Sequence, residues 1–263
     1  MCATFVEDPA LAAYERLAPF YDLFTESYDY ERWLSKLEAL ALENGLSGKR
    51  LLDVGCGTGK SFAPMLARGY EVVGCDISPA MVDKARETAA GRAQVLVADM
   101  RDLPPVGVFD LVTCLDDALN YVLSEDELHA SVAGMAANLR AGGLLLFDLN
   151  TVATYRGLFA HDFASETDGL FFCWRGEAGE DAAPGEVHSA VVEVFAHDGG
   201  ECWRRHSSRH VQRHHTREAV EAAVAAAGLE LVLVHGQVTG AQIDAEPDEA
   251  HHRKLIHLAR KPQ

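Results

Sequence analysis

Two hydrophobic patterns alternate through most of the chain. Short runs of apolar residues are typical of buried strands, and apolar residues that recur every three or four positions are typical of helices. The first pattern predicts strands at residues 50–54, 71–76, 94–98, 109–115 and 144–149, the last of them entered through Gly142 and Gly143. The second predicts helices at residues 61–68, 79–90 and 125–139. This alternation indicates a parallel sheet covered by helices on both faces.

The pattern changes after Asn150. Helix signals fade, and two strand-like segments at 187–197 and 201–211 flank Asp198-Gly199-Gly200, which predicts an antiparallel hairpin. The alternation then resumes with a helix at 216–227 ended by Gly228 and strands at 230–235 and 254–260, while the acidic stretch 244–249 is expected to be an exposed loop. We therefore expect an N-terminal helical cap over 1–48, a core over 49–151 and 216–263, and an antiparallel β insertion over 152–215.

Composition narrows the class of protein. With 263 residues, of which 48% are hydrophobic, the chain can bury a large core without cross-links. The six cysteines show no paired spacing and are expected to be reduced and mostly buried. A formal charge of −17 repels phosphate backbones, which argues against a nucleic-acid partner. The N-terminus is acidic rather than basic, and no apolar run is as long as a membrane span, so we expect a cytoplasmic protein without a membrane partner.

A glycine-rich loop follows the first predicted strand. Gly55, Gly57 and Gly59 occupy every second position after Asp53, and glycine lets a backbone approach a ligand closely. Parallel sheets bind ligands outside the carboxyl ends of their strands, where this loop lies. Dinucleotide-binding folds have a similar loop, but their third glycine comes one residue later, and the phosphate-loop pattern is absent. The spacing favours a ligand without a pyrophosphate.

Two further acidic residues end the next two predicted strands. Asp76 stands seventeen residues after Gly59, where a carboxylate accepts hydrogen bonds from the hydroxyls of a ribose, as in NAD enzymes too. Asp99 and Met100 follow the third strand, where they are suited to bind an adenine amino group and cover its ring. Each acid taken singly is equally well explained as a surface carboxylate. Three such acids, Asp53, Asp76 and Asp99, at the ends of successive predicted strands together predict an adenosine site.

The ordered segments LDVGCGTGKS, VVGCDISPAMVDKAR, VADMRDL, FDLVTCLDDALNYV and LRAGGLLLFDLNT resemble the motifs of class I S-adenosylmethionine-dependent methyltransferases. The resemblance covers residues 10–151 and 216–260. Within that superfamily, YDLF, YERWL, DDALNY and FDLNT resemble a small-molecule group related to bacterial sugar N-methyltransferases and glycine N-methyltransferase. The resemblance implies a Rossmann-like α/β fold with a seven-stranded sheet, whose last strand is antiparallel, and S-adenosylmethionine (SAM) as the cofactor, with S-adenosylhomocysteine as its product.

The resemblance also implies roles for individual residues. The three glycines would flank the methionine part of SAM, and Asp53 would support their loop from below. Asp76 would hold the ribose, Asp99 and Met100 would hold the adenine, and Leu115 would contribute backbone to the amino-acid end. Tyr21 and Trp33 match positions that close over the cofactor. The cofactor set is therefore Tyr21, Trp33, Asp53, Gly55, Gly57, Gly59, Asp76, Ile77, Asp99, Met100 and Leu115.

Candidates for the acceptor side come from two segments. Tyr14 and Tyr21 are seven residues apart on a helix that Pro19 is expected to bend, and aromatic faces stabilise a sulfonium cation; a core stripe is the alternative for Tyr14. Asp117, Asn120 and Tyr121 follow the fourth strand, where acceptors lie in this superfamily. Asp117 is expected to attract an ammonium and take its proton, although Asp is also a favoured helix cap. Tyr21 and Asp117 are the catalytic candidates.

Three histidines lie on one face of the second insertion segment. His206, His210 and His214 are spaced by four residues, and on a strand such neighbours lie too far apart to share a metal ion, so no metal is expected. One of them is expected either to face the active site as a base for a hydroxyl acceptor or to belong to a polar outer face.

We therefore interpret the chain as a methyltransferase that acts on an amine or hydroxyl of a small molecule, with the insertion selecting the acceptor. A nucleotide-linked oxidoreductase and a non-catalytic SAM-binding module are the alternatives. The identity of the acceptor and the formation of a homo-oligomer are left open by the sequence.

Overall fold

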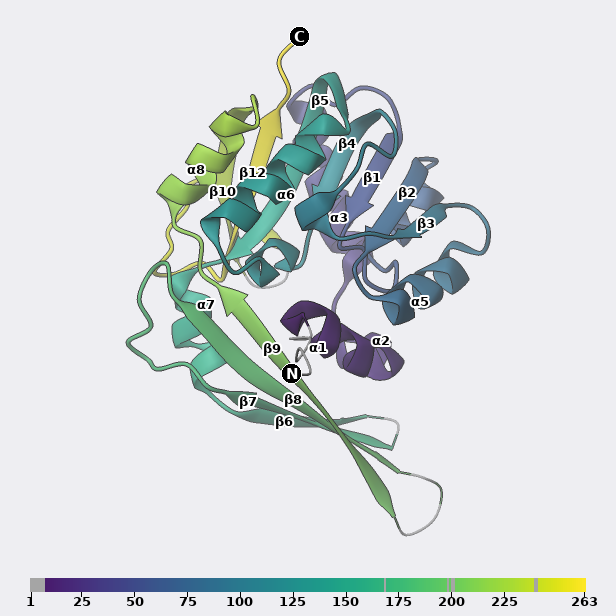
Figure 1. Cartoon of the computed structure of the whole chain (residues 1–263), viewed down its shortest axis with the longest axis vertical. Coiled ribbons are helices and arrows are strands. Elements are labelled where there is room, and N and C mark those ends of the chain that lie inside the picture. The colour runs from purple at the N-terminus through teal and green to yellow at the C-terminus, as the bar shows by residue number, and fades with distance from the viewer. Residues whose placement is uncertain (1–7, 168, 198, 200–201, 239–240) are drawn as a thin grey trace, which may run out of the picture.

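The computed structural model describes residues 8–167, 169–197, 199, 202–238 and 241–263. The chain forms two sheets joined by helices (Figure 1). The larger sheet has eight strands, in the spatial order β11 (Gln242–Asp244), β10 (Glu230–Val238), β12 (Lys254–Arg260), β5 (Leu139–Asn150), β4 (Phe109–Cys114), β1 (Arg50–Val54), β2 (Glu71–Asp76) and β3 (Gln94–Val97).

The larger sheet is parallel from β3 to β5 and antiparallel at β12, as expected. β12 pairs with β5 along its whole length and with β10 on its other side, both in the antiparallel sense. The seven expected strands are therefore present. The short strand β11 adds an eighth because the chain folds back after β10 and pairs Gln242 with Val238. The acidic stretch after it is exposed, apart from half-buried Glu249.

Helices cover both faces of this sheet. α3 (Tyr30–Glu43), α4 (Ala63–Ala67) and α5 (Pro79–Ala89) pack on one face. α6 (Glu125–Ala137) and α8 (Arg217–Ala226) pack on the other. We expected α3 to be part of an N-terminal cap, but it belongs to the first layer, because Leu34, Leu37 and Ala41 form one apolar face that is buried against the sheet.

Local sequence sets where these helices begin. The side chain of Ser78 accepts a hydrogen bond from the backbone of Met81 and starts α5 two residues after β2 ends. Ser124 and Glu127 form a reciprocal capping box at the start of α6. Both caps fix the turn that leaves the carboxyl edge of the sheet, which is the edge that carries the candidate site.

The strand β5 differs from its prediction. It begins at Leu139, directly after α6, and runs through Gly142 and Gly143 instead of starting beyond them. Its pairing with β4 shifts between Phe109 and Leu111, and Gly142 has a φ of +71°. The glycine pair therefore forms an irregularity inside a long strand, because glycine adopts a left-handed conformation that would strain other residues.

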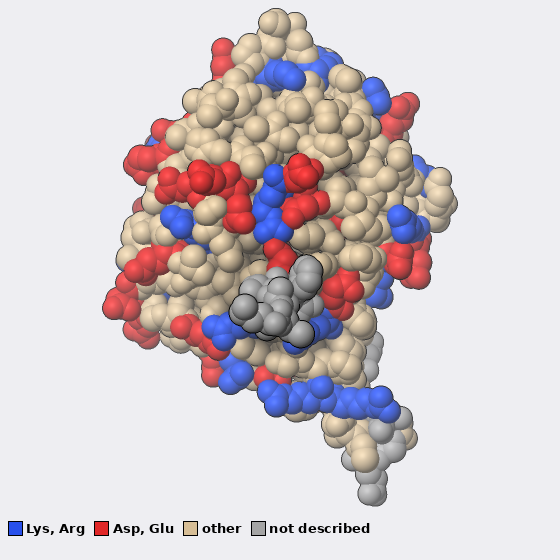
Figure 2. Space-filling model, viewed as in Figure 1, with Lys and Arg blue, Asp and Glu red and all other residues tan. Residues whose placement is uncertain are grey.

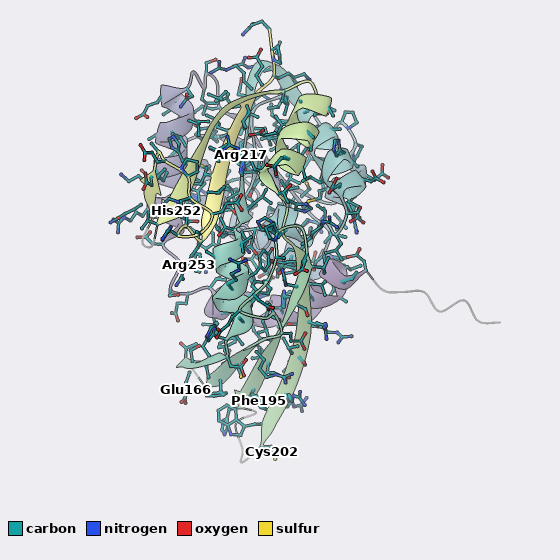
Figure 3. The ribbon with its side chains drawn as sticks, turned by 90° about the vertical axis from the view of Figure 1, so that its left-hand side faces the viewer. Glu166, Phe195, Cys202, Arg217, His252 and Arg253 are labelled. Atoms are coloured by element: carbon teal, nitrogen blue, oxygen red, sulfur yellow. The ribbon has the colours of Figure 1, made fainter. Side chains whose placement is uncertain are left out.

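The smaller sheet is a four-stranded antiparallel one that extends away from the core (Figures 1 and 3). Its strands are β6 (Phe163–Thr167), β7 (Leu170–Gly176), β8 (Val187–His197) and β9 (Trp203–Arg213). β8 and β9 form the expected hairpin, although β9 starts and ends two residues later than predicted. Of the predicted turn, only Gly199 is described; Asp198, Gly200 and also Glu201 lie outside the described residues. No sequence-based prediction covers the strands β6 and β7 or the helices α7 (Val152–Arg156) and η4 (Leu158–Ala160).

The N-terminal segment lies between the two sheets (Figure 1). It consists of α1 (Pro9–Leu17), the short turn η1 (Ala18–Phe20) and α2 (Tyr21–Phe24), so the helix is interrupted at Pro19 as expected. Leu17, Phe20 and Phe24 pack with the inner face of the smaller sheet, where Phe172 is buried. This segment therefore forms the roof over the carboxyl edge of the larger sheet.

The structure bears on two expectations from composition, those for the cysteines and for membrane-spanning segments. Cys56, Cys75 and Cys114 are buried free thiols, whereas Cys173 is half-buried and Cys202 exposed; Cys2 lies outside the described residues. Within the described ranges, no helix is both long and apolar enough to cross a membrane.

Candidate active site

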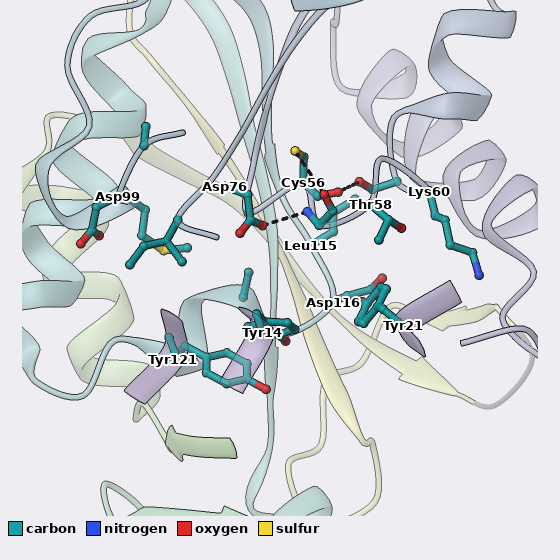
Figure 4. A pocket seen from close by; sticks show the side chains of 18 of the residues that line it. Tyr14, Tyr21, Cys56, Thr58, Lys60, Asp76, Asp99, Leu115, Asp116 and Tyr121 are labelled. Atoms are coloured by element: carbon teal, nitrogen blue, oxygen red, sulfur yellow. Dashed lines mark hydrogen bonds between the residues drawn. The ribbon is translucent and has the colours of Figure 1, made fainter. Parts of the chain in front are cut away.

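A cavity opens at the carboxyl edge of β1, β2 and β4, beneath the N-terminal segment (Figure 4). It encloses about 820 Å³, part of which is open to solvent, a volume typical of small-molecule sites. Its walls come from α1, the glycine loop, the ends of three strands and the turn after β4. The topology therefore brings together segments that are up to a hundred residues apart.

The glycine loop forms one wall of the cavity. Gly55 and Gly57 line it, with φ values of +70° and +53°. A Cβ on Gly55 would lie 2.9 Å from the Cβ of Ala118, so a side chain there would close the gap between the loop and the turn after β4. Gly59 does not line the cavity; a Cβ there would come within 2.6 Å of the Phe62 ring, so this glycine serves the turn itself.

Asp53 lies beneath the loop and outside the cavity lining. Its carboxylate accepts hydrogen bonds from Thr113 at 2.6 Å and from Ser61 at 2.5 Å. Burial raises the pKa of Asp53 to about 6, against the opposite influence of these two hydroxyl donors. Asp53 therefore ties the start of the loop to its end and to β4.

Asp76 points into the cavity from the end of β2 (Figure 4). One carboxylate oxygen accepts the backbone N–H of Gly57 and the other that of Ser78, both at 2.9 Å. Burial raises the pKa of Asp76, and these backbone donors oppose that shift. Each oxygen keeps a further lone pair for a ligand hydroxyl. The neighbouring Ile77 also lines the cavity.

Asp99 and Met100 line the far end of the cavity together with Arg101. The guanidinium of Arg101 holds both carboxylate oxygens of Asp99, at distances from 2.6 to 3.0 Å. Burial acts to raise the pKa of Asp99, but the hydrogen bonds and charge of Arg101 outweigh it and lower that pKa. Asp99 is thus held as a carboxylate by a neighbour that the sequence analysis did not consider.

Four tyrosines surround the middle of the cavity: Tyr14, Tyr21, Tyr30 and Tyr121. Tyr14 is the centre of the group, with ring centroids 6.2 Å from Tyr21 and 5.1 Å from Tyr121. Trp33 was expected to close over the cofactor, but it does not line the cavity; it is 5% exposed in the core under α3. The reason is that α3 packs on the sheet, which places Tyr30 and not Trp33 at the cavity.

Leu115 lines the cavity as expected. Next to it lies a charged cluster of Asp116, Asp117, Asp148 and Lys254, of which Asp116 lines the cavity; we call this cluster the floor. The ammonium of Lys254 lies 2.9 Å from Asp117, 3.2 Å from Asp148 and 3.6 Å from Asp116. Asp148 also accepts the backbone N–H groups of Asp116 and Asp117, at 2.9 and 2.7 Å. Three carboxylates thus share one buried ammonium.

The turn after β4 carries backbone strain. Asp116 and Asp117 both have a φ of +56°, a left-handed conformation that is unusual outside glycine and is held here by their hydrogen bonds to Asp148. This turn directs Asp116 into the cavity (Figure 4). Burial raises the pKa of Asp116, although Lys254 opposes the shift.

The turn also corrects two predictions for the acceptor side. Asp117 does not line the cavity, because Lys254 and, at 2.5 Å, the side chain of Gln212 bind its carboxylate. Asn120 is fully buried; its amide group donates to the carbonyl of Arg213 and accepts from the backbone of Asn150, both at 2.9 Å. It joins the turn to both sheets. Of the acceptor-side candidates, Tyr14 and Tyr121 reach the cavity.

Sequence reasoning missed Asp148, Lys254 and Tyr30. Asp148 and Lys254 are charged residues within or beside apolar strand sequences, LLLFDLN and KLIHLAR, and a charge in a buried strand is a signal for a paired group. Along the chain, Asp148 and Lys254 lie 31 and 137 residues after Asp117. Their pairing therefore needs the β5–β12 register, in which Lys254 lies opposite Asn150.

The residues present fit SAM. The glycine loop leaves room for the methionine part, Asp76 offers acceptors for two hydroxyls, and Met100 offers an apolar surface at the adenine end. The tyrosine faces and the negative excess of the floor suit a cation. The strand order and the cavity at the carboxyl edge define a class I methyltransferase fold.

Comparisons with known proteins agree with this class. A methyltransferase domain family matches residues 51–143. The chain is 28% identical to a putative methyltransferase, YqeM, of Bacillus subtilis over 252 residues, which cover 94% of this chain and 97% of that protein. It is 26% identical over 234 residues to the dTDP-3-amino-3,6-dideoxy-α-D-glucopyranose N,N-dimethyltransferase of Streptomyces fradiae, covering 85% of this chain and 88% of that protein.

Solved structures give the same picture. A SAM-dependent methyltransferase of Clostridium acetobutylicum superposes with a TM-score of 0.78 at 22% identity, covering 95% of this chain and 99% of that one. SAM-bound CalS10, an amino pentose methyltransferase of Micromonospora echinaspora, has a TM-score of 0.71 at 26% identity, covering 92% and 95%. The chain is a SAM-dependent methyltransferase with a class I fold, as the resemblance implied.

Proposed function

We propose that this methyltransferase methylates an amine nitrogen of a small molecule. The observation that carries the proposal is the floor of the cavity, where three carboxylates surround one ammonium and Asp116 reaches the cavity. A cavity with excess negative charge attracts a cationic acceptor more strongly than a neutral alcohol. The relatives that act on amino sugars support an amine as the acceptor.

The cofactor half of the site is assigned to residues at three strand ends. Gly55 and Gly57 are proposed to contact the methionine part, Asp76 and Ile77 the ribose, and Asp99 with Met100 the adenine. Asp53 and Gly59 are proposed to shape the loop from outside the cavity. Bound SAM supplies an electrophilic methyl group on a sulfonium. The faces of Tyr14 and Tyr21 lie where they can stabilise that positive charge.

The acceptor half is assigned to the turn after β4 and its neighbours. An amine must lose a proton to attack, and Asp116 is a suitable proton acceptor because burial raises its pKa toward that of a stronger base. Asp117, which we expected in this role, instead keeps Lys254 and Gln212 in place. Alignment of the reacting atoms supplies the larger part of the acceleration in such a displacement. Tyr21 is proposed to help that alignment from the roof.

The second sheet and the N-terminal segment are proposed to select the acceptor. The segment lies between the sheets, and α1 packs directly on β9. The second sheet therefore supports the cavity wall through α1, and its four strands form a sheet that is separate from the core sheet. We place the domain boundary on this basis near the end of β5 and the start of α8. A cytoplasmic location and a small-molecule partner complete the proposal.

The test is transfer of labelled methyl groups from SAM to a matched panel. Wild-type protein is incubated with dTDP-3-amino-3,6-dideoxyglucose and glycine, and in parallel with dTDP-6-deoxyglucose and glycolate, in which a hydroxyl replaces the amine. We expect label in the amines and little in the hydroxy compounds. Asp116→Asn is expected to lower the rate by about a hundredfold, the usual range for losing one proton acceptor.

Asp126→Asn is the matched control, because it removes the same charge from an exposed position on α6. It is expected to leave transfer unchanged. Label in the hydroxy compounds alone would replace the amine by a hydroxyl as the acceptor. Tight binding of SAM without transfer to any compound of the panel would speak for a non-catalytic binding module.

A further inference from the structure

A hydrogen-bonded chain runs from the cavity into the second sheet. The hydroxyl of Tyr121 lies 2.8 Å from Nδ1 of His210, and Nε2 of His210 lies 3.1 Å from the hydroxyl of Ser208. On the cavity side, the ring of Tyr14 packs against that of Tyr121, with ring centroids 5.1 Å apart. Tyr14 and Tyr121 line the cavity, whereas His210 and Ser208 stand behind them on β9 and are each 3% exposed.

The chemistry of these groups fixes the direction of the chain. A phenol is a stronger hydrogen-bond donor than an imidazole N–H or an aliphatic hydroxyl, and an imidazole nitrogen is the strongest neutral acceptor present. Tyr121 therefore donates to Nδ1 of His210, which places the single ring proton on Nε2, directed at Ser208. The hydroxyl proton of Tyr121 therefore points away from the cavity.

We propose that His210 is a positioning residue for the methyl acceptor: by accepting the hydroxyl proton of Tyr121, it turns the lone pairs of that oxygen toward the cavity, where they accept an N–H of the acceptor. The proposal rests on the proposed function and specifies which wall the acceptor amine meets. The floor supplies a carboxylate for charge, and this wall supplies an oriented oxygen acceptor. A group without a hydrogen to donate finds no partner on it.

The alternative role, a base that takes the acceptor's proton through Tyr121, is disfavoured by burial. Burial lowers the pKa of His210 to about 4, far below that of an aliphatic amine, so a proton on its ring is costly. The ring stays neutral at physiological pH, which is what a fixed hydrogen-bond acceptor requires. His210 also packs edge-on against Tyr14, with ring centroids 5.5 Å apart, so it fixes both tyrosine rings at once.

Four variants test the proposal in the full-length protein. His210→Phe keeps a ring but removes the acceptor for Tyr121. His210→Asn returns an acceptor oxygen near the position of Nδ1 yet cannot carry a proton. Tyr121→Phe removes the donor. The control is His206→Phe, on the same strand and the same face as His210. The ring centroid of His206 lies 4.7 Å from that of Phe20, and His206 does not line the cavity.

The readouts are the dissociation constant of SAM and kcat and KM for the amine found in the panel. We expect His210→Phe to lower kcat/KM for the amine by about tenfold, the worth of one hydrogen bond, with SAM affinity unchanged. His210→Asn should recover most of that loss. In the Tyr121→Phe background, His210→Phe should add little, because both changes break the same link. His206→Phe should match the wild type.

Nitrogen NMR of isotope-labelled histidine gives a readout that needs no acceptor: His210 should be neutral with its proton on Nε2, and Tyr121→Phe should shift its Nδ1 signal. A proton on Nδ1, an unchanged kcat/KM in His210→Phe, or a His210→Asn variant as damaged as His210→Phe would each overturn the proposal while leaving methyl transfer intact. A wild-type protein that binds SAM but methylates no amine would remove the proposed function, and the positioning role with it.

Discussion

Replacing Lys254 by methionine removes the ammonium from the floor of the cavity and keeps the volume of the side chain. Three carboxylates, at 2.9, 3.2 and 3.6 Å from that ammonium, then face one another, and Asp148 among them is fully buried. Breaking a buried ion pair by removing one partner typically costs about 3–5 kcal/mol. We expect Lys254→Met to lower the free energy of unfolding by roughly that amount near pH 8.

The loss should shrink as the pH falls. The ammonium opposes the rise in the pKa of Asp116, so its removal raises that pKa further, and the folded variant binds a proton more tightly and is relieved by acid. Denaturant unfolding at about pH 8 and about pH 6 should therefore show a smaller difference from the wild type at the lower pH. Lys36→Met, an exposed change on α3, serves as the control. A Lys254→Met protein as stable as the wild type near pH 8, or one whose deficit does not depend on pH, would refute this account.

Three further predictions follow from the site. Asp76→Ala should weaken SAM binding by about a hundredfold in calorimetry, because two hydrogen bonds to a charged acceptor are lost. Asp83→Ala, an exposed change on α5, should leave SAM affinity unchanged. Equal affinity in both variants would contradict the ribose assignment. Burial raises the pKa of Asp53 to about 6, so its contribution to stability, about 3 kcal/mol for a shift of this size, is present in acid and is lost as the pH rises through that value. Asp53→Asn should therefore flatten the dependence of the free energy of unfolding on pH between about pH 4 and about pH 7. Asn120→Ala should cost about 2–4 kcal/mol of stability in thermal or denaturant unfolding, since two buried backbone groups lose their partner, and should leave SAM affinity unchanged; a stable variant with poor acceptor binding would restore its role as a substrate contact.

Local signals were sufficient for the core. Five apolar runs, four of which ended at a glycine or an acidic residue, each became a strand within two residues of its predicted end; only β5 began well before its prediction. Asp76, Asp99 and the loop glycines could be placed because the carboxyl ends of parallel strands meet at one edge whatever the details of packing. For the same reason the cofactor half of the cavity could be outlined from the sequence.

The acceptor half depends on contacts that the sequence does not encode locally. Asp116 and Asp117 are adjacent and chemically identical, and only the left-handed turn held by Asp148 decides that the first faces the cavity and the second faces Lys254. Trp33 and Tyr30 are likewise three residues apart on one helix, and the packing of α3 on the sheet decides which of them reaches the cavity. β6 lacked a signal because it is a short edge strand whose residues are mostly exposed, whereas β7 lies inside the sheet and its apolar run LFFCW did carry a strand signal.

The position of Lys254 on β12 has a consequence for how the molecule is made. The cavity draws its first wall residue, Ala10, from α1, whereas the counter-charge beside the cavity comes from Lys254 on β12, far along the chain. A nascent chain that already contains the glycine loop and all its acidic partners still lacks the ammonium beside Asp148. Until β12 has been synthesised, the chain therefore carries the motifs of the enzyme with three carboxylates that have no counter-charge on the acceptor side.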